Sequence, residues 1–342
     1  MPLRPVQSRY ARIEREADLP PRQPHVVDVA VLDMNHGWPN LGHDSLVHAV
    51  LEEDLGAAHF AEETGIHLRV LSFDVRRSGA IPEPPGGRFA LYLGTGGPGH
   101  IDPHVNDGVS AGSQGMREDA SWEEPLFRLF DAIFDDEDSA LLAVCHSFGI
   151  LCRWAGVARA VLRGPEKGGK STGVLENVFT SEAADDPWFG RFVNGGERRL
   201  RILDNRLFDL IPGPRPFPAG MIPIGFETLG VGGPRGDALT MMEFARDRAG
   251  VMPRVFGVNH HPEILHRSAQ LEILEAMVAA GEVSEHWAAE RREILTRSFA
   301  DEDSMGRLAE TAEITLLGPL RFHVRRQLAA RAEALGRAAA GA

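Results

Sequence analysis

Residues 140–156 read ALLAVCHSFGILCRWAG, with one of the two cysteines of the chain at the point where the apolar pattern changes. Residues 140–144 are apolar, as in a buried strand, and the spacing of apolar residues after Cys145 becomes helical. A cysteine at such a junction lies above the sheet at the N-terminus of a helix, where the helix favours a thiolate. We therefore interpret Cys145 as a nucleophile; the alternative is a small buried apolar side chain. Cys152, inside the helix, is predicted to belong to the core.

Apolar runs and segments of helical spacing alternate on both sides of this stretch. Strands are predicted at 26–32, 67–73, 88–93, 140–144, 239–244 and 254–258, and helices at 44–64, 122–136, 147–162 and 264–280. The alternation predicts an α/β fold of the flavodoxin-like type, a mostly parallel sheet with helices on both faces. Residues 170–235 contain short apolar runs broken by glycine and proline, and we expect them to be more antiparallel.

Composition divides the chain into three parts. Residues 1–24 are rich in arginine, glutamate and proline and are predicted to be an N-terminal arm. Residues 25–282 are predicted to form the catalytic α/β domain. Residues 283–342 are rich in alanine, arginine and glutamate and are predicted to be a helical C-terminal extension, with helices at 285–299 and 304–340.

The overall charge and cysteine content exclude several classes of protein. The formal net charge is −13, and we expect such an acidic chain to bind neither nucleic acid nor an anionic membrane. Only two cysteines are present, which is too few for a disulfide framework and indicates a reducing compartment. No stretch approaches the roughly 18 apolar residues of a membrane span. We therefore expect a cytoplasmic protein.

A candidate base follows the strand predicted at 254–258. Because the carboxyl ends of parallel strands meet at one edge of a sheet, His261 is expected near Cys145. Glu263 lies close enough along the chain to accept a hydrogen bond from this imidazole and orient it. The alternative is a metal site made with His260, but Pro262 and the spacing do not match a helical H-E-x-x-H motif. His260 is interpreted as a packing residue at the rim.

A glycine-rich loop follows the strand predicted at 88–93. Gly96-Gly97-Pro98-Gly99 lets a backbone N–H turn into the site, while the proline fixes the loop. Such an amide would stabilise the oxyanion that forms when a thiolate attacks a carbonyl. The amide of His146, directly after the cysteine, would be the second donor.

Two other motifs could bind ligands. His100, Asp102 and His104 could hold a cation, but we interpret them as a polar loop that caps the site, and we predict no metal and no cofactor. The segment from Gly164 to Ser171 satisfies G-x-x-x-x-G-K-[ST], the phosphate-binding loop pattern. That motif should follow a strand and open a helix, whereas here a long helix is predicted before it and a mixed segment after it.

These motifs, in this order, resemble the class I (triad) glutamine amidotransferases, whose late motif reads Gly-Val-Gln-Phe-His-Pro-Glu where this chain has Gly-Val-Asn-His-His-Pro-Glu. The resemblance covers about residues 25–282. It implies that Cys145, His261 and Glu263 are nucleophile, base and orienting acid. It also implies that the amides of Gly97 and His146 form the oxyanion hole.

The same family has a segment resembling Arg163-Gly-Pro-Glu…Gly-Gly-Lys-Ser after its nucleophile helix, which accounts for the apparent phosphate loop. The resemblance makes four residues candidates for substrate binding: Gly96, Pro98, Lys170 and Ser171. Two positions depart from the family pattern Gly-x-Cys-x-Gly-x-Gln. Ser147 replaces the second glycine, and Gly149 stands where the glutamine that helps to hold the substrate would be.

The function implied is hydrolysis of the amide of glutamine, or of a γ-glutamyl compound, through a cysteinyl thioester. Ammonia would pass to a separate synthetase partner, because residues 283–342 are too few for a synthetase domain. This extension could dock that partner or form a homo-oligomer contact. Two alternatives stay open. One is a γ-glutamyl hydrolase or an acyltransferase like the homoserine acyltransferases, and the other is a non-catalytic regulatory protein.

Overall fold

The computed structural model describes residues 9–52, 55–113, 115–167, 169–193, 198–300 and 302–340. In these residues the strands are β1 Tyr10–Ile13, β2 Val26–Asp33, β3 His67–Asp74, β4 Phe89–Gly94, β5 Ala140–Val144, β6 Ala158–Leu162, β7 Ser171–Phe179, β8 Arg199–Arg206, β9 Phe208–Pro212, β10 Ile222–Thr228, β11 Arg235–Arg246 and β12 Pro253–Val258. The α-helices are α1 Leu41–Leu51, α2 Ala57–Thr64, α3 Val75–Ser78, α4 Glu123–Asp135, α5 His146–Trp154, α6 Ser181–Ala184, α7 Arg267–Ala279, α8 Glu285–Ser298, α9 Glu302–Ala312 and α10 Gly318–Ala340.

One large sheet organises the described part of the chain. Ten strands follow the order β1-β3-β2-β4-β5-β12-β11-β10-β7-β8, and β6 pairs with β9 in a separate ribbon. Neighbours from β1 to β12 are parallel, and those from β12 to β8 are antiparallel. The segment β3-β2-β4-β5-β12 has the 2-1-3-4-5 order of flavodoxin-like folds. The predicted α/β fold of the flavodoxin-like type is therefore confirmed.

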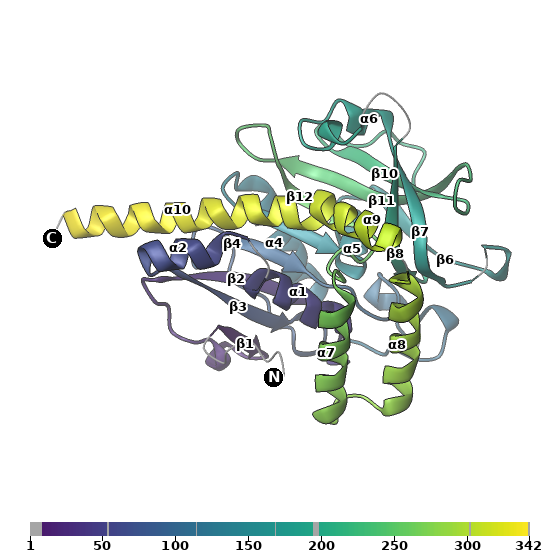
Figure 1. Cartoon of the computed structure of the whole chain (residues 1–342), viewed down its shortest axis with the longest axis horizontal. Helices are drawn as coiled ribbons and strands as arrows, with labels where there is room; N and C mark the ends of the chain where they lie inside the picture. The colour runs from purple at the N-terminus through teal and green to yellow at the C-terminus, as the bar shows by residue number, and fades with distance from the viewer. Residues whose placement is uncertain are drawn as a thin grey trace.

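Both faces of the parallel strands are buried. In β2, Val29 and Val31 belong to the apolar cluster that includes α1 and α10, whereas Ala30 and Leu32 belong to the cluster that includes α4 and α5. A strand covered on both faces needs apolar residues at successive positions, which explains why residues 26–32 are all apolar except Asp28. Figure 1 shows this layering, with α10 and α4 on opposite sides of the sheet.

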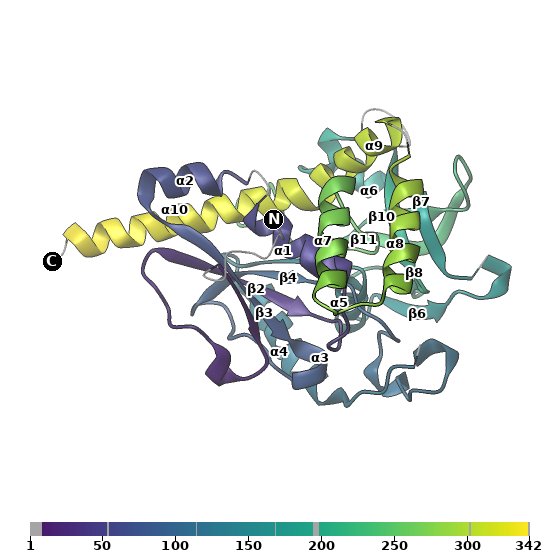
Figure 2. The same cartoon turned by 60° about the horizontal axis from the view of Figure 1, so that its bottom comes forward.

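The C-terminal helices pack on this domain. Figures 1 and 2 show α7 and α8 side by side, and α10 lying next to α2. A π-helical turn at Glu313–Leu317 joins α9 to α10. The indole nitrogen of Trp188 donates to the carbonyl of Ile314 at 2.9 Å, and Leu320 and Val324 enter the main apolar cluster. Within the described residues, no helix is both long and apolar enough to cross a bilayer.

The N-terminal segment contributes a strand to the sheet. Of the predicted arm, residues 1–8 lie outside the described residues, and Tyr10–Ile13 forms β1 at the edge, parallel to β3. The Arg12 guanidinium lies 3.4 Å from the Asp33 carboxylate and 3.0 Å from that of Asp74. These carboxylates are at the ends of β2 and β3, so buried charge fixes the position of β1.

Two predicted helices have different bounds in the structure. The helix predicted at 147–162 ends at Trp154, because Gly156 takes a left-handed φ of 66°, and residues 158–162 form β6 instead. The helical segment predicted at 44–64 is divided into α1 and α2. Gly56, with φ of 77°, separates them.

Candidate active site

Cys145 occupies the sharp turn between β5 and α5. Its φ of 53° and ψ of −104° are unfavourable for a residue with a side chain. The turn is held by the Cys145 N–H, which donates to the Val258 carbonyl of β12 at 2.7 Å, and by the Cys145 carbonyl, which accepts from the Gly149 N–H at 3.0 Å. The side chain is partly exposed, so the turn presents the sulfur at the N-terminus of α5.

Ser147 replaces a family glycine without disrupting this turn. Its hydroxyl oxygen accepts from the Val144 N–H and donates to the Val144 carbonyl, both at 2.9 Å. The facing residue is Gly94 at the end of β4, and a Cβ added there would lie 2.5 Å from the Ser147 Cβ. The close approach that the family achieves with a glycine after the cysteine is therefore achieved here with a glycine on the neighbouring strand.

Ile101 lies against Gly149, the position at which the family pattern has glutamine. A Cβ at Gly149 would lie only 2.3 Å from Cδ1 of Ile101, so a side chain at position 149 would require Ile101 to move. Ile101 comes from the loop after the glycine-rich segment and lines the cavity next to Cys145. An apolar side chain from a different part of the chain thus fills the space of the missing glutamine.

His261 and Glu263 lie together after β12. The Nδ1 atom of His261 is 2.7 Å from Oε1 of Glu263, and both side chains are buried. The backbone N–H of His261 donates to the Leu203 carbonyl at 2.9 Å, which fixes the segment. The Nε2 atom has no hydrogen-bond partner among the described residues. A Cβ added at Gly96 would lie 3.2 Å from Cε1 of His261 and 3.9 Å from Sγ of Cys145, so the ring and the sulfur flank the same glycine.

The surroundings of His261 favour its protonated form. Burial of the ring acts to lower the pKa of His261, but the Glu263 carboxylate and the Cys145 sulfur act in the opposite direction. The net result is a pKa of His261 well above its ordinary value. A protonated imidazole next to a sulfur atom can supply the proton that a leaving amine requires.

A buried ion pair holds the glycine-rich loop. The Arg76 guanidinium donates to the carbonyls of Met34 at 2.9 Å and Pro98 at 2.6 Å, and it pairs with Glu118 at 2.7 Å. A Cβ at Gly97 would lie 2.2 Å from the Met34 carbonyl oxygen, so only glycine fits there. Arg76 belongs to α3 and Glu118 to a loop distant in the sequence, and neither residue stands in a motif from which the pair could have been predicted.

His146 lies next to this loop and is held neutral. Its ring makes a hydrogen bond with the Gly97 backbone, which acts to raise its pKa. Burial, together with the positive charge of Arg76 and the nearby His100, has the larger effect and lowers the pKa of His146 well below its ordinary value. The ring therefore stays uncharged beside the cavity while the backbone of the same residue starts α5.

These residues line a cavity of about 330 Å³ that contains cations but no carboxylate. Cys145, His146, His261, Gly97 and Pro98 contribute to its wall. Two further residues, Trp287 and Arg291, reach the cavity from α8, and neither stands in a motif that marks it in the sequence. Their spacing of four residues could have suggested one helix face, but only the tertiary packing directs that face to the cavity. The Arg291 guanidinium stacks over the Trp287 ring at 4.0 Å.

Lys170 and Ser171, the two substrate-binding candidates that follow β6, lie differently with respect to the cavity. Lys170 lines the cavity, and desolvation together with the neighbouring Arg291 lowers the pKa of its amine. Ser171 does not line the cavity, because its hydroxyl donates to the Asp204 carboxylate at 2.6 Å. The loop before them joins two strands, β6 and β7, and the cations of Arg163 and Lys167 are paired with Asp209. Gly168 of this motif lies outside the described residues.

The other histidines make structural contacts. The Nδ1 atom of His100 accepts from the Asp102 N–H at 2.9 Å, and His104 pairs with the Asp102 carboxylate at 3.0 Å. His260 is buried beside Thr315, 3.2 Å from its hydroxyl, and burial lowers its pKa to about 3. In the part of the chain that the structure describes, no group of three histidine, cysteine, aspartate or glutamate residues is arranged to hold a metal ion.

The chain was compared with family models, curated proteins and solved structures. No family model matches the chain, and no curated protein matches it. Among solved structures, it is similar to a glutamine amidotransferase from Thermotoga maritima, with 18% identity and a TM-score of 0.45 over 88% of this chain and 98% of the other. It is also similar to a glutamine amidotransferase from Methylobacillus flagellatus, with 13% identity and a TM-score of 0.46 over 90% and 95% of the two chains.

Proposed function

We propose that the chain hydrolyses the side-chain amide of glutamine, or of a γ-glutamyl compound, through a thioester on Cys145. The observation that carries this proposal is the strained turn at Cys145 beside an imidazole that is paired with Glu263 at 2.7 Å. A nucleophile, a base and an orienting carboxylate in this relation are the requirements for acyl transfer.

In the proposed reaction, the proton of the Cys145 thiol lies on His261, whose surroundings favour the protonated form, and the Cys145 thiolate attacks the amide carbon. The amides of Gly97 and His146 stabilise the resulting oxyanion. His261 then returns the proton to the nitrogen, the carbon–nitrogen bond breaks, and ammonia leaves. Water, deprotonated by His261, hydrolyses the thioester and restores the thiol. The ammonia would pass to a synthetase partner, and α8 and the other C-terminal helices are the candidate docking elements.

The charge of the cavity supports an acidic substrate. Lys170 and Arg291 line it together, and no aspartate or glutamate does. Guanidinium and ammonium groups bind carboxylates through charge-assisted hydrogen bonds. We assign these two residues to the α-carboxylate of the substrate, since Gly149 stands where the resembling family has the glutamine that helps to hold the substrate.

The test is release of glutamate and ammonia from L-glutamine by the purified chain, compared with the α-methyl ester of glutamine. We expect hydrolysis of glutamine, with a KM for the ester raised by about tenfold or more because it lacks the carboxylate charge. If the chain is silent without a partner, a diazoketone analogue of glutamine should still label Cys145, detected by peptide mass spectrometry. Absence of both turnover and labelling would overturn the proposal.

One observation favours a second candidate, an acyltransferase or γ-glutamyl hydrolase that uses the same residues. Ile101 gives the cavity an apolar wall where the family has a polar glutamine side chain. That wall suits an acyl group without an amide. Turnover of an acyl-CoA by a chain that ignores glutamine would select this candidate.

Glu263→Gln tests the proposed role of the orienting acid through its pH dependence. The Glu263 carboxylate acts to raise the pKa of His261, so its loss lowers that pKa. The protonated imidazole that donates to the leaving nitrogen is then lost at a lower pH. We expect the alkaline limb of kcat/KM for glutamine to move to lower pH by about one unit or more.

The matched control is Glu63→Gln, which removes an exposed carboxylate that pairs with His59 at 3.2 Å on α2. This variant should keep the wild-type pH profile. An alkaline limb that stays in place in Glu263→Gln would contradict the assigned role.

A further inference from the structure

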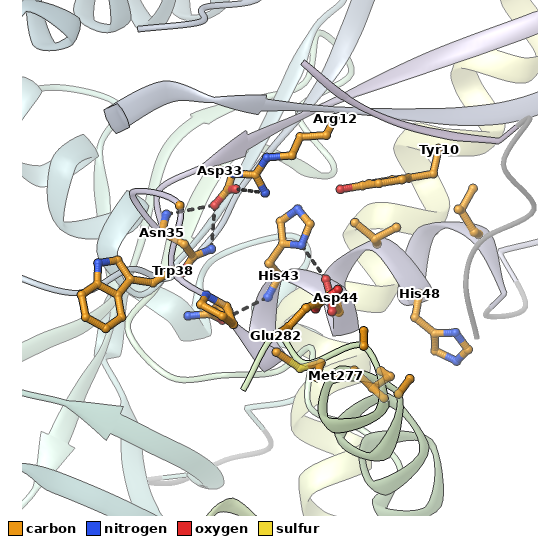
Figure 3. A pocket seen from close by; sticks show the side chains of 18 of the residues that line it. Tyr10, Arg12, Asp33, Asn35, Trp38, His43, Asp44, His48, Met277 and Glu282 are labelled. Atoms are coloured by element: carbon orange, nitrogen blue, oxygen red, sulfur yellow. Dashed lines mark hydrogen bonds and ion pairs between the residues drawn. The ribbon is translucent and has the colours of Figure 1, made fainter. Parts of the chain in front are cut away.

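A second and larger cavity adjoins the candidate active site. It has a volume of about 520 Å³ and lies between β1, the residues after β2, α1 and the end of α7 (Figure 3). Residues 38–40 form a wall of both cavities. The strand order of the sheet reverses here, because β3 and β4 lie on opposite sides of β2. Ligands of open α/β sheets bind at such a switch point.

The polar half of this cavity is acidic. Its lining includes the carboxylates of Asp33, Asp44, Glu52 and Glu282. The cation Arg12 also lines it, but this guanidinium contacts three carboxylates, those of Asp33, Asp74 and Glu14, at 3.0 to 3.4 Å. Arg12 therefore has little capacity left for an anionic ligand.

The remaining groups do not neutralise this charge. The ring of His43 lies between Asp33 and Asp44, with its Nδ1 atom 2.8 Å from the Asp44 carboxylate (Figure 3). Asp44 remains partly exposed to the cavity, and Glu282 makes no ion pair with any described residue. Glu52 is paired with Arg9 at 3.8 Å and Asp33 with Arg12, and His48 also lines the cavity, so the carboxylates of Asp44 and Glu282 are the ones left for a ligand.

An unsatisfied buried acceptor also belongs to the lining. Asn35 is only 1% exposed, and its Nδ2 donates to the Asp33 carboxylate at 2.7 Å, which fixes the orientation of the amide. The Oδ1 atom has no hydrogen-bond partner among the described residues. A buried carbonyl oxygen without a donor destabilises the protein unless a ligand supplies one.

The other half of the cavity is apolar. Val47 and Leu51 of α1 face Ile273, Ala276 and Met277 of α7 across it. The Tyr10 phenol lies at the junction of the two halves, and burial together with the charge of Asp44 raises its pKa to about 12, so that it stays a hydrogen-bond donor. The contrast with the neighbouring cavity, which has cations and no carboxylate, indicates that the two take ligands of different charge.

We propose that this second cavity binds a small primary amine with a hydrocarbon body. The ammonium group lies by the carboxylates of Asp44 and Glu282, and it donates to the Oδ1 atom of Asn35. The hydrocarbon body packs against the apolar side chains of α1 and α7. Carboxylates and a neutral acceptor are the partners that an ammonium group requires, because it has three donors and no acceptor.

The experiment is calorimetric titration of the full chain carrying Cys145→Ser, so that its outcome does not depend on catalysis at the other cavity. Benzylamine is the probe, and benzyl alcohol and benzoate are its neutral and anionic counterparts with the same ring. We expect benzylamine to bind at least about tenfold more tightly than benzyl alcohol, and benzoate, which the cationic neighbouring cavity can take, not to displace benzylamine. Equal binding of the amine and the alcohol, or no binding of the amine up to about 10 mM, would overturn the proposal.

Substitutions in the lining test whether benzylamine binds in this second cavity. Asp44→Asn and Glu282→Gln should each weaken benzylamine about tenfold, whereas Glu272→Gln, an exposed carboxylate on α7 outside the lining, should have no effect. Glu282 is exposed and has no ion pair with a described residue, so its variant tests the site even if Asp44→Asn misfolds through the loss of its contact with His43. Ala276→Phe, which fills the apolar half, should abolish binding of the amine. Unchanged affinity in Glu282→Gln and Ala276→Phe would place the amine elsewhere and overturn the assignment.

Discussion

Cys145→Ser will lower kcat for glutamine hydrolysis by about 10⁴-fold or more, with little change in thermal stability. The serine hydroxyl is far harder to deprotonate than a thiol, so His261 cannot generate the attacking anion. The turn itself should persist, because backbone hydrogen bonds to Val258 and Gly149 hold it rather than the side chain. Ammonia release and the melting temperature from circular dichroism give the two readouts.

Cys152→Ala is the control for this variant. Cys152 is fully buried in α5, and burial raises the pKa of its thiol well above the ordinary value, so it is an inert core residue. We expect Cys152→Ala to retain hydrolysis and to give the same single adduct with iodoacetamide as the wild type, whereas Cys145→Ser gives none under native conditions. Turnover that survives in Cys145→Ser would sink the thioester mechanism.

Gly97→Ala will reduce kcat by about 100-fold with a smaller effect on KM. The new methyl group would lie 2.2 Å from the Met34 carbonyl oxygen, so the loop must shift. The shift moves the Gly97 amide away from the oxyanion, which exists only along the reaction path, and therefore acts on kcat. The measurement is steady-state kinetics at saturating glutamine, together with the melting temperature.

Gly112→Ala provides the comparison for this second variant. Gly112 also lies in a loop near His100, but an added Cβ there would meet its neighbours at an ordinary 3.7 Å. This variant should have wild-type kinetics. A Gly97→Ala chain that folds and keeps its kcat would show that the amide of residue 97 is not an oxyanion donor.

The sequence predicts the strands and helices of the parallel part well, because their apolar residues are continuous or periodic. Val26–Asp33 is apolar at nearly every position since both of its faces are covered. β1 could not be predicted in the same way. Tyr10–Ile13 is short and carries Arg12, whose partners Asp33 and Asp74 are distant in the sequence.

The residues of the candidate site also divide into those that the sequence predicts and those that it does not. Cys145, His261 and Gly97 could be selected because each directly follows a recognisable strand. Ile101 could not be predicted to fill the place of a missing glutamine, because its contact with Gly149 depends on how a long loop folds back. Nor could Trp287 and Arg291, since the packing of α8 against the rest of the chain directs them to the cavity.

During synthesis on a ribosome, β2 emerges long before the helix that covers one of its faces. Leu320, Val324 and Leu328 of α10 fill the same apolar cluster as Val29 and Val31. Until residue 328 has left the exit tunnel, the part of that face that α1 does not cover stays open to water and to chaperones. We therefore expect the native structure to form only after translation of nearly all the described residues, so that a stalled or truncated chain is a substrate for quality control.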